Sequence, residues 1–232
     1  MNLTEKDIAG MIDFSGVAGG LGEDYVEMLA REAVAHRFKG VIVMPCYMKK
    51  LGGLLAGQDD ILPGTVVGFP SGAGTTGTKV FEAKQCVSDG AEELDMVINV
   101  GALRSGAYGY CRDEVAAVVD SAGGKTVKVI LETHYLADDE VKRGCEICAE
   151  AGAGFVKTST GWADTGATEE RVRLMKTVVG DALEVKAAGG IRTAETLVKL
   201  YRAGATRFGI GAESALKIIK EVRNMPGGAV VV

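Results

Sequence analysis

Short apolar runs rich in β-branched residues recur along the whole chain and alternate with longer segments of helical periodicity. Each run is four to seven residues long, which is the length of a buried strand. The runs lie at residues 11–14, 40–45, 65–70, 93–99, 127–133, 155–160, 184–189 and 207–212. Because the later runs begin about thirty residues apart, as successive βα units do, the pattern predicts eight repeats of a strand followed by a helix.

The intervening segments repeat their apolar positions with helical spacing, and several end in Gly-Ala, which suits a helix that leads into a strand. The clearest helical segments are residues 23–38, 79–91, 139–153, 169–179 and 194–205. The pattern predicts an α/β protein with a (β/α)8 TIM barrel, which typically needs about 250 residues. A doubly wound open sheet is the alternative, but no glycine fingerprint of a dinucleotide-binding fold follows the first run.

Composition agrees with one globular domain over residues 1–232, since hydrophobic residues make up 47% and charged residues 25% of the chain. The net charge of −5 includes no basic cluster, so we expect no nucleic-acid partner. No apolar run approaches the roughly 20 residues of a membrane span, and residues 1–10 lack the features of a signal peptide. We therefore expect a cytoplasmic protein without a membrane partner, for which a homo-oligomer is possible.

Cysteine and histidine usage narrows the possible chemistry. The five cysteines are odd in number and are expected to be free thiols: Cys46, Cys86, Cys111, Cys145 and Cys148. Cys145 and Cys148 form a C-x-x-C motif inside a predicted helix, where a core role is favoured over redox or metal chemistry. The two histidines, His36 and His134, exclude a histidine-rich metal site, and no metal is expected.

Three ionisable residues, Asp95, Lys157 and Lys186, lie inside predicted strands that are otherwise apolar. The carboxyl ends of barrel strands carry the chemistry, and an unpaired charge inside a strand is costly. Lys157 and Lys186 belong to the sixth and seventh runs, which are neighbours in a barrel. Equivalent registers would bring their ammonium groups together.

A like charge and desolvation both lower the pKa of a lysine from about 10.4, and a neutral amine is the nucleophile that converts a carbonyl into an imine. A carboxylate at Asp95 would pair with a lysine and move protons. The alternative is a purely structural Asp–Lys pair, but two lysines against one carboxylate leave an excess charge that function explains more easily. Lys128 in the fifth run is a candidate for lining the pocket.

Glycine-rich turns follow the last two strands, at residues 187–193 and 209–214. Turns after the seventh and eighth strands are where barrels commonly hold a phosphate group on backbone N–H groups. The candidate phosphate-binding glycines are Gly189, Gly190 and Gly211. The pair of turns favours a phosphorylated substrate.

At these residues the chain resembles the deoxyribose-phosphate aldolase family. The segments ELDMVINVGAL, VKVILET, FVKTSTGW, VKAAGGIRT and PCYM carry the resemblance, which runs from about Asp13 to Ile219. It implies that Lys157 forms the Schiff base, that Lys186 perturbs it and that Asp95 relays protons. It further implies reversible cleavage of 2-deoxy-D-ribose 5-phosphate to acetaldehyde and D-glyceraldehyde 3-phosphate, without a metal or organic cofactor.

The same segments suggest further substrate-binding or pocket-lining residues and contain three departures from the family pattern. Ser15, Thr160 and Ser214 are candidates for substrate binding, and Cys46 of PCYM for lining the pocket. The departures are the first strand, which lacks a lysine after Asp13, Met44 before Pro45, and residues 209–214, where Glu213 stands in the phosphate loop.

These departures affect substrate recognition and leave the three ionisable residues intact. Alternatives to the deoxyribose-phosphate reaction are therefore an imine-forming lyase with another aldehyde or sugar substrate, or a barrel that binds a sugar phosphate without catalysis.

Overall fold

A closed barrel of parallel strands forms the centre of the computed structural model, which describes residues 2–232. Its strands are β2 (Ile12–Gly16), β3 (Gly40–Val43), β4 (Leu62–Val67), β5 (Glu93–Val97), β6 (Thr126–Ile130), β7 (Phe155–Lys157), β8 (Glu184–Ala188) and β9 (Arg207–Gly211). Each strand pairs with the next along the chain, and β9 pairs with β2 to close the ring. The predicted TIM barrel is confirmed, and the open sheet is excluded.

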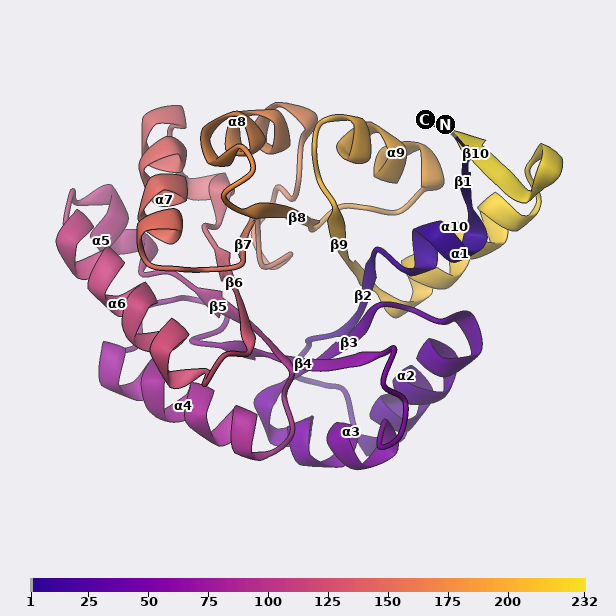
Figure 1. Ribbon diagram of the computed structural model, residues 1–232, viewed down its shortest axis with the longest axis horizontal. Coiled ribbons are helices and arrows are strands. Elements are labelled where there is room, and N and C mark those ends of the chain that lie inside the picture. Colours follow the sequence, from indigo (N-terminus) through magenta and orange to yellow (C-terminus); the bar gives the residue numbers. More distant parts are fainter. Residues whose placement is uncertain (1) are drawn as a thin grey trace.

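Helices surround the strands on the outside of the barrel (Figure 1). They are α2 (Glu23–His36), α3 (Met48–Leu54), α4 (Thr76–Ser88), α5 (Val100–Arg104), α6 (Tyr108–Ser121), α7 (Asp138–Glu150), α8 (Glu169–Val179), α9 (Ala194–Arg202) and α10 (Ala212–Arg223). Short 3₁₀ turns are η1 (Pro45–Tyr47), η2 (Thr133–Tyr135) and η3 (Pro226–Gly228). The predicted helices are all present. α7 ends before the predicted boundary because Gly152 takes a left-handed conformation (φ 78°) that closes it.

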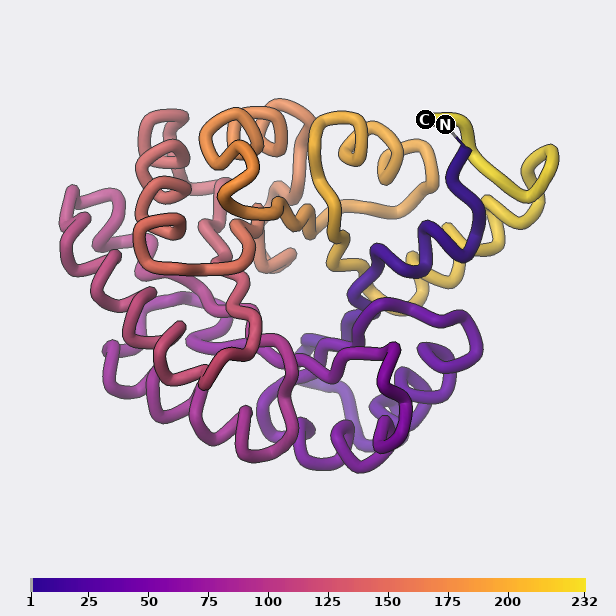
Figure 2. Tube along the Cα trace, in the orientation of Figure 1, coloured from indigo at the N-terminus to yellow at the C-terminus, as the bar shows by residue number. Residues whose placement is uncertain are grey.

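A small second sheet, which the sequence pattern did not predict, joins the two ends of the chain. It pairs β1 (Asn2–Thr4) with β10 (Ala229–Val231) in antiparallel register, and α1 (Glu5–Ala9) follows β1 directly. Figure 2 shows the two termini side by side. Strands of three residues are too short to show a periodicity, so this pairing is visible only in the tertiary structure.

The barrel strands alternate between two buried environments. Along β6, Val127 and Val129 belong to the apolar core, whereas Lys128 between them contacts carboxylates of the barrel interior. The same alternation places Asp95 between Leu94 and Met96. Apolar side chains therefore join the barrel to its helices, and charged side chains occupy part of its interior.

Three features outside the barrel interior bear on the sequence predictions. All five cysteines are free thiols, and Cys145 and Cys148 are buried on α7, in agreement with a core role. None of the helices within residues 2–232 is long and apolar enough to span a bilayer. Over the same residues, no group of three or more His, Cys, Asp or Glu side chains is arranged to hold a metal ion.

Candidate active site

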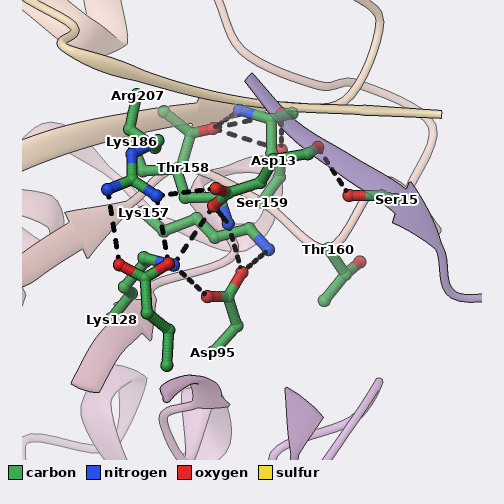
Figure 3. A network of polar contacts seen from close by, with 12 residues as sticks. Asp13, Ser15, Asp95, Lys128, Lys157, Thr158, Ser159, Thr160, Lys186 and Arg207 are labelled. Carbon is green, nitrogen blue, oxygen red and sulfur yellow. Dashed lines mark hydrogen bonds and ion pairs between the residues drawn. The ribbon is translucent and has the colours of Figure 1, made fainter. Parts of the chain in front are cut away.

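Lys157 and Lys186 lie directly opposite each other on β7 and β8, as the predicted register requires. Both ammonium groups donate a hydrogen bond to the same oxygen, Oδ2 of Asp95 on β5, each with an N–O distance of 2.6 Å. Figure 3 shows the two lysine side chains converging on this carboxylate. The predicted trio is therefore assembled, with Asp95 as the shared acceptor of both lysines.

A second acidic layer adjoins the trio inside the barrel (Figure 3). Lys186 also donates to Asp13 of β2, which accepts from Lys128 at 3.1 Å and from Arg207 at 2.7 Å. Glu93 of β5 contacts both Lys128 and Arg207. The interior charges thus form one continuous network instead of isolated pairs.

The charges of this network do not balance. Within the described residues it joins four basic and three acidic side chains, namely Lys128, Lys157, Lys186 and Arg207 with Asp13, Glu93 and Asp95. If every group were ionised, the formal charge would be 4 − 3 = +1. A buried net charge is costly, so the network favours the loss of one proton from a lysine.

The two central carboxylates remain ionised. Burial raises the pKa of Asp13 and of Asp95, but the surrounding cations outweigh burial and hold both pKa values below the ordinary range. For Asp13 these cations are Lys128, Lys186 and Arg207. For Asp95 they are Lys128, Lys157 and Lys186.

The buried lysines respond to the same surroundings in opposite directions. Burial lowers the pKa of Lys186 to about 8, with Asp13 and Asp95 opposing the shift and the neighbouring lysines assisting it. Burial also lowers the pKa of Lys128, but three carboxylates outweigh it and leave that pKa raised. Of these two lysines, Lys186 is therefore the one that can exchange a proton near neutral pH, whereas Lys128 stays a fixed cation.

A cavity of about 360 Å³ opens above the network, and Lys157 is the member of the trio that lines it. The Lys157 side chain is 6% exposed, whereas those of Lys186 and Asp95 are fully buried. A small molecule in the cavity would therefore reach the Lys157 amine first.

The far side of the cavity is formed by the glycine-rich turns. Gly189 and Gly190 line it in left-handed conformations, and Gly211 and Ser214 line it at the start of α10. The exposed side chain of Arg192 also lines the cavity and adds a positive charge. An anion in this position would meet backbone N–H groups, the N-terminus of α10 and a guanidinium group.

The two helices that follow these turns differ at their N-termini. Gly211 at the start of α10 makes no side-chain cap. At the start of α9, the Thr193 side chain accepts from Thr196 N, and Ala194 N donates to Glu221. Of these two helices, only α10 therefore offers an uncapped N-terminus to a ligand.

Comparison with known proteins shows the family of this chain. The model of the DeoC/LacD family aldolase matches residues 15–221. Deoxyribose-phosphate aldolase of Staphylococcus carnosus (strain TM300) is 48% identical over 214 residues, covering 92% of this chain and 96% of the relative. The same-named protein of Klebsiella pneumoniae (strain ATCC 700721 / MGH 78578) is 42% identical over 228 residues, covering 97% and 92%. The chain belongs to the DeoC/LacD aldolase family.

A solved structure extends the family relationship to three dimensions. The unique tetrameric structure of deoxyribose phosphate aldolase from Aeropyrum pernix superimposes with a TM-score of 0.88 at 31% identity, covering 95% of this chain and 93% of that one. This DeoC/LacD aldolase is accordingly a carbon–carbon lyase built on a TIM barrel.

Most of the residues that the sequence analysis of this DeoC/LacD aldolase named for substrate binding or pocket lining lie at the cavity, but two do not. Ser15 and Thr160 line it, together with the predicted glycines and Ser214. Lys128 lies in the ion network below the cavity and is fully buried, so its predicted lining role is wrong. Cys46 is exposed in η1 and lines a separate surface pocket between α3 and α4, because the η1 turn carries it away from the barrel mouth.

Sequence reasoning assigned no role to several residues of this site. Asp13, Glu93 and Arg207 stand in apolar strands just as Asp95 does, so the same signal of a charge inside a strand identifies them. Arg192 and Trp162 lie in loops that line the cavity. The sequence gives no comparable signal for them, because the side-chain direction of a loop residue does not follow a periodic pattern.

Proposed function

We propose that this chain is a class I aldolase that reversibly cleaves 2-deoxy-D-ribose 5-phosphate to acetaldehyde and D-glyceraldehyde 3-phosphate, with Lys157 forming the Schiff base. The observation that carries the proposal is that Lys157 lines the cavity while sharing the Asp95 carboxylate with the buried Lys186. The names of the relatives support the choice of substrate.

The shared carboxylate supports a route for the proton that Lys157 must lose. Asp95 Oδ2 accepts from both lysines, so a proton released by Lys157 can pass through this oxygen to neutral Lys186. The pKa of Lys186, about 8, makes it a suitable acceptor. The Lys157 amine then adds to the carbonyl carbon of acetaldehyde and forms a carbinolamine.

Proton transfers complete the reaction in the synthetic direction. The carbinolamine hydroxyl takes a proton and leaves as water, which gives the imine, and loss of a proton from the imine methyl group gives an enamine. The enamine carbon attacks the aldehyde carbon of glyceraldehyde 3-phosphate, whose oxygen takes a proton. Water then hydrolyses the resulting imine and frees the sugar phosphate and the Lys157 amine.

The phosphate end of the substrate fits the glycine-rich side of the cavity. The N-terminus of α10 and Arg192 are the positive elements there. Glu213, which would repel a phosphate, is exposed and lies outside the cavity lining. The departures in this loop therefore do not argue against a phosphorylated substrate.

Quaternary state and location are part of the proposal. The Aeropyrum pernix relative is tetrameric by its description, and we propose a homo-oligomer for this chain. Light scattering of the purified protein tests this. The cytoplasmic location expected from the sequence stays a prediction.

Borohydride trapping tests the Schiff base directly. Incubation with acetaldehyde and sodium borohydride should add a reduced two-carbon group to Lys157, because reduction fixes an imine that otherwise hydrolyses. Peptide mapping by mass spectrometry identifies the labelled lysine, and Lys157→Met is the matched control. A label on Lys186, or no label, would contradict the proposal. Turnover of deoxyribose 5-phosphate separates it from another imine-forming lyase and from a non-catalytic barrel.

A further inference from the structure

Trp162 links two loops that both line the cavity but follow strands far apart in the sequence, β2 and β7. Its indole Nε1 donates to the carbonyl oxygen of Val17 at 3.1 Å, and both residues line the cavity. Its ring packs edge-on against Phe69, with 5.6 Å between the ring centroids. The loop after β7 is thereby connected to the loop after β2, so the position of Trp162 defines one wall of the cavity.

The backbone beneath Trp162 depends on one buried carboxylate. Glu132, which follows β6, is 4% exposed and accepts from Thr160 N at 3.2 Å and from Thr160 Oγ1. Thr160 Oγ1 in turn accepts from Trp162 N at 3.0 Å. A continuous chain of hydrogen bonds thus runs from Glu132 through Thr160 to Trp162.

The backbone of Glu132 has an unfavourable conformation while its carboxylate accepts the hydrogen bonds from Thr160. Its φ of 55° and ψ of 62° lie in the left-handed region, which costs a non-glycine residue on the order of 1–2 kcal/mol. Such a conformation persists only where surrounding contacts select it. The contacts of the Glu132 carboxylate with Thr160 contribute to this selection, together with the backbone hydrogen bonds from Tyr135 N to Glu132 O and from Thr133 N to Thr158 O.

The rest of the loop is anchored independently, on the opposite side. Thr158 Oγ1 donates to Ala188 O at 3.1 Å, and Ala167 N donates to the same carbonyl oxygen at 3.1 Å. These bonds attach both ends of the loop to Ala188, the last residue of β8. Its central part, residues 160–162, has Glu132 as its buried anchor.

We propose that Glu132 is a positioning residue, which acts through Thr160 to hold Trp162 as the substrate-contacting wall of the cavity. The inference rests on the proposed function in placing the substrate above Lys157. Glu132 itself is not among the residues that line the cavity, and within residues 2–232 its carboxylate forms hydrogen bonds with Thr160 and none with the lysine trio. Loss of the anchor should therefore weaken substrate binding more than the chemical step.

Steady-state kinetics of Glu132→Gln test this. The amide keeps the shape of the side chain but removes its negative charge, so the hydrogen bonds that Thr160 N and Thr160 Oγ1 donate to it lose their charge assistance and become weaker. KM for deoxyribose 5-phosphate should rise about tenfold while kcat changes by less than about threefold. Trp162→Phe retains an aromatic ring but no N–H group, and should raise KM about fivefold. Glu146→Gln, on the exposed face of α7, is the matched control and should leave both constants unchanged.

Trp162 is the one tryptophan of the chain, so its fluorescence reports on this wall without substrate. In folded Glu132→Gln the emission should move to longer wavelength and acrylamide quenching should increase, because a released indole is more exposed to water. Unchanged emission, or a fall of kcat at constant KM, would overturn the inference. If Glu132→Gln does not fold, Trp162→Phe decides, and an unchanged KM for it would overturn the inference as well.

Borohydride trapping keeps the two proposals separate. Acetaldehyde should still label Lys157 in Glu132→Gln, since the lysine trio is unchanged. If the unaltered chain gives no label, the proposed function is refuted. The positioning role of Glu132 can still be tested in that case, because the fluorescence comparison requires no turnover. A normal label with unaltered fluorescence and KM in Glu132→Gln would refute the positioning role alone.

Discussion

Lys157 and Lys186 are register partners on neighbouring strands, and both donate to one oxygen of Asp95 at 2.6 Å. They differ in access, because Lys157 lines the cavity whereas Lys186 is fully buried. Under the proposed function, this difference assigns substrate contact to Lys157 and proton exchange to Lys186. The separation could not be read from the strand sequences, in which both lysines follow a valine.

The pH dependence of activity should report on Lys186. Its pKa of about 8 implies that kcat/KM rises as the pH passes about 8, where its neutral form becomes available to accept a proton. Lys186→Leu removes this acceptor, so the rise should move to higher pH and kcat should fall by a factor on the order of 10². Initial rates from pH 6 to pH 10 provide the measurement, with circular dichroism to confirm folding. The same profile in both proteins would reject the coupling.

Acid should destabilise the barrel through its buried carboxylates. Folding holds the pKa values of Asp13 and Asp95 below the ordinary aspartate value of 3.8, so their stabilisation is fully present above that pH. It is lost as the pH falls toward their folded pKa values, because the unfolded chain then binds more protons. The free energy of unfolding in urea should decrease between pH 5 and pH 3 by an amount on the order of a few kcal/mol. The exposed control Asp60→Asn should show the same decrease. A free energy of unfolding that stays constant over this pH range would contradict the ionised network.

The phosphate group should dominate substrate preference. Charge-assisted hydrogen bonds contribute about 1.5–3 kcal/mol each, so two of them give a preference for deoxyribose 5-phosphate over deoxyribose well above tenfold in kcat/KM. Arg192→Gln should reduce this preference by about tenfold and leave free deoxyribose unaffected. Glu213→Ser should change neither substrate appreciably, because Glu213 lies outside the cavity lining. Equal kcat/KM for the two sugars in the unaltered chain would refute the phosphate site.

A close backbone approach should make one glycine of the substrate loop irreplaceable. A Cβ atom on Gly166 would lie 2.1 Å from the carbonyl oxygen of Gly189, so the loop after β7 and the phosphate-side turn would have to separate. Gly166→Ala should therefore lower kcat/KM by at least tenfold and destabilise the protein by about 1–3 kcal/mol. Gly53→Ala, where the added Cβ meets no atom within 4 Å, is the control. Equal Tm and activity for the two variants would argue against the close packing.

The sequence by itself determined the barrel and the three charged residues that meet inside it. Eight apolar runs at regular intervals can bury both faces only in a parallel sheet covered by helices, and the charges at Asp95, Lys157 and Lys186 stood out because a strand interior rarely accepts them. Parallel neighbours share a register, so even the meeting of the two lysines followed from their equivalent positions on adjacent strands.

The tertiary structure decided what depends on the directions of side chains and loops. Lys128 extends into the ion network and Cys46 is carried away from the cavity, although the sequence had placed both at the pocket. The link from Trp162 to Val17 joins residues that are 145 positions apart. No local pattern encodes such a contact, because loop conformations and long-range partners are selected only when the closed barrel brings distant strand ends together.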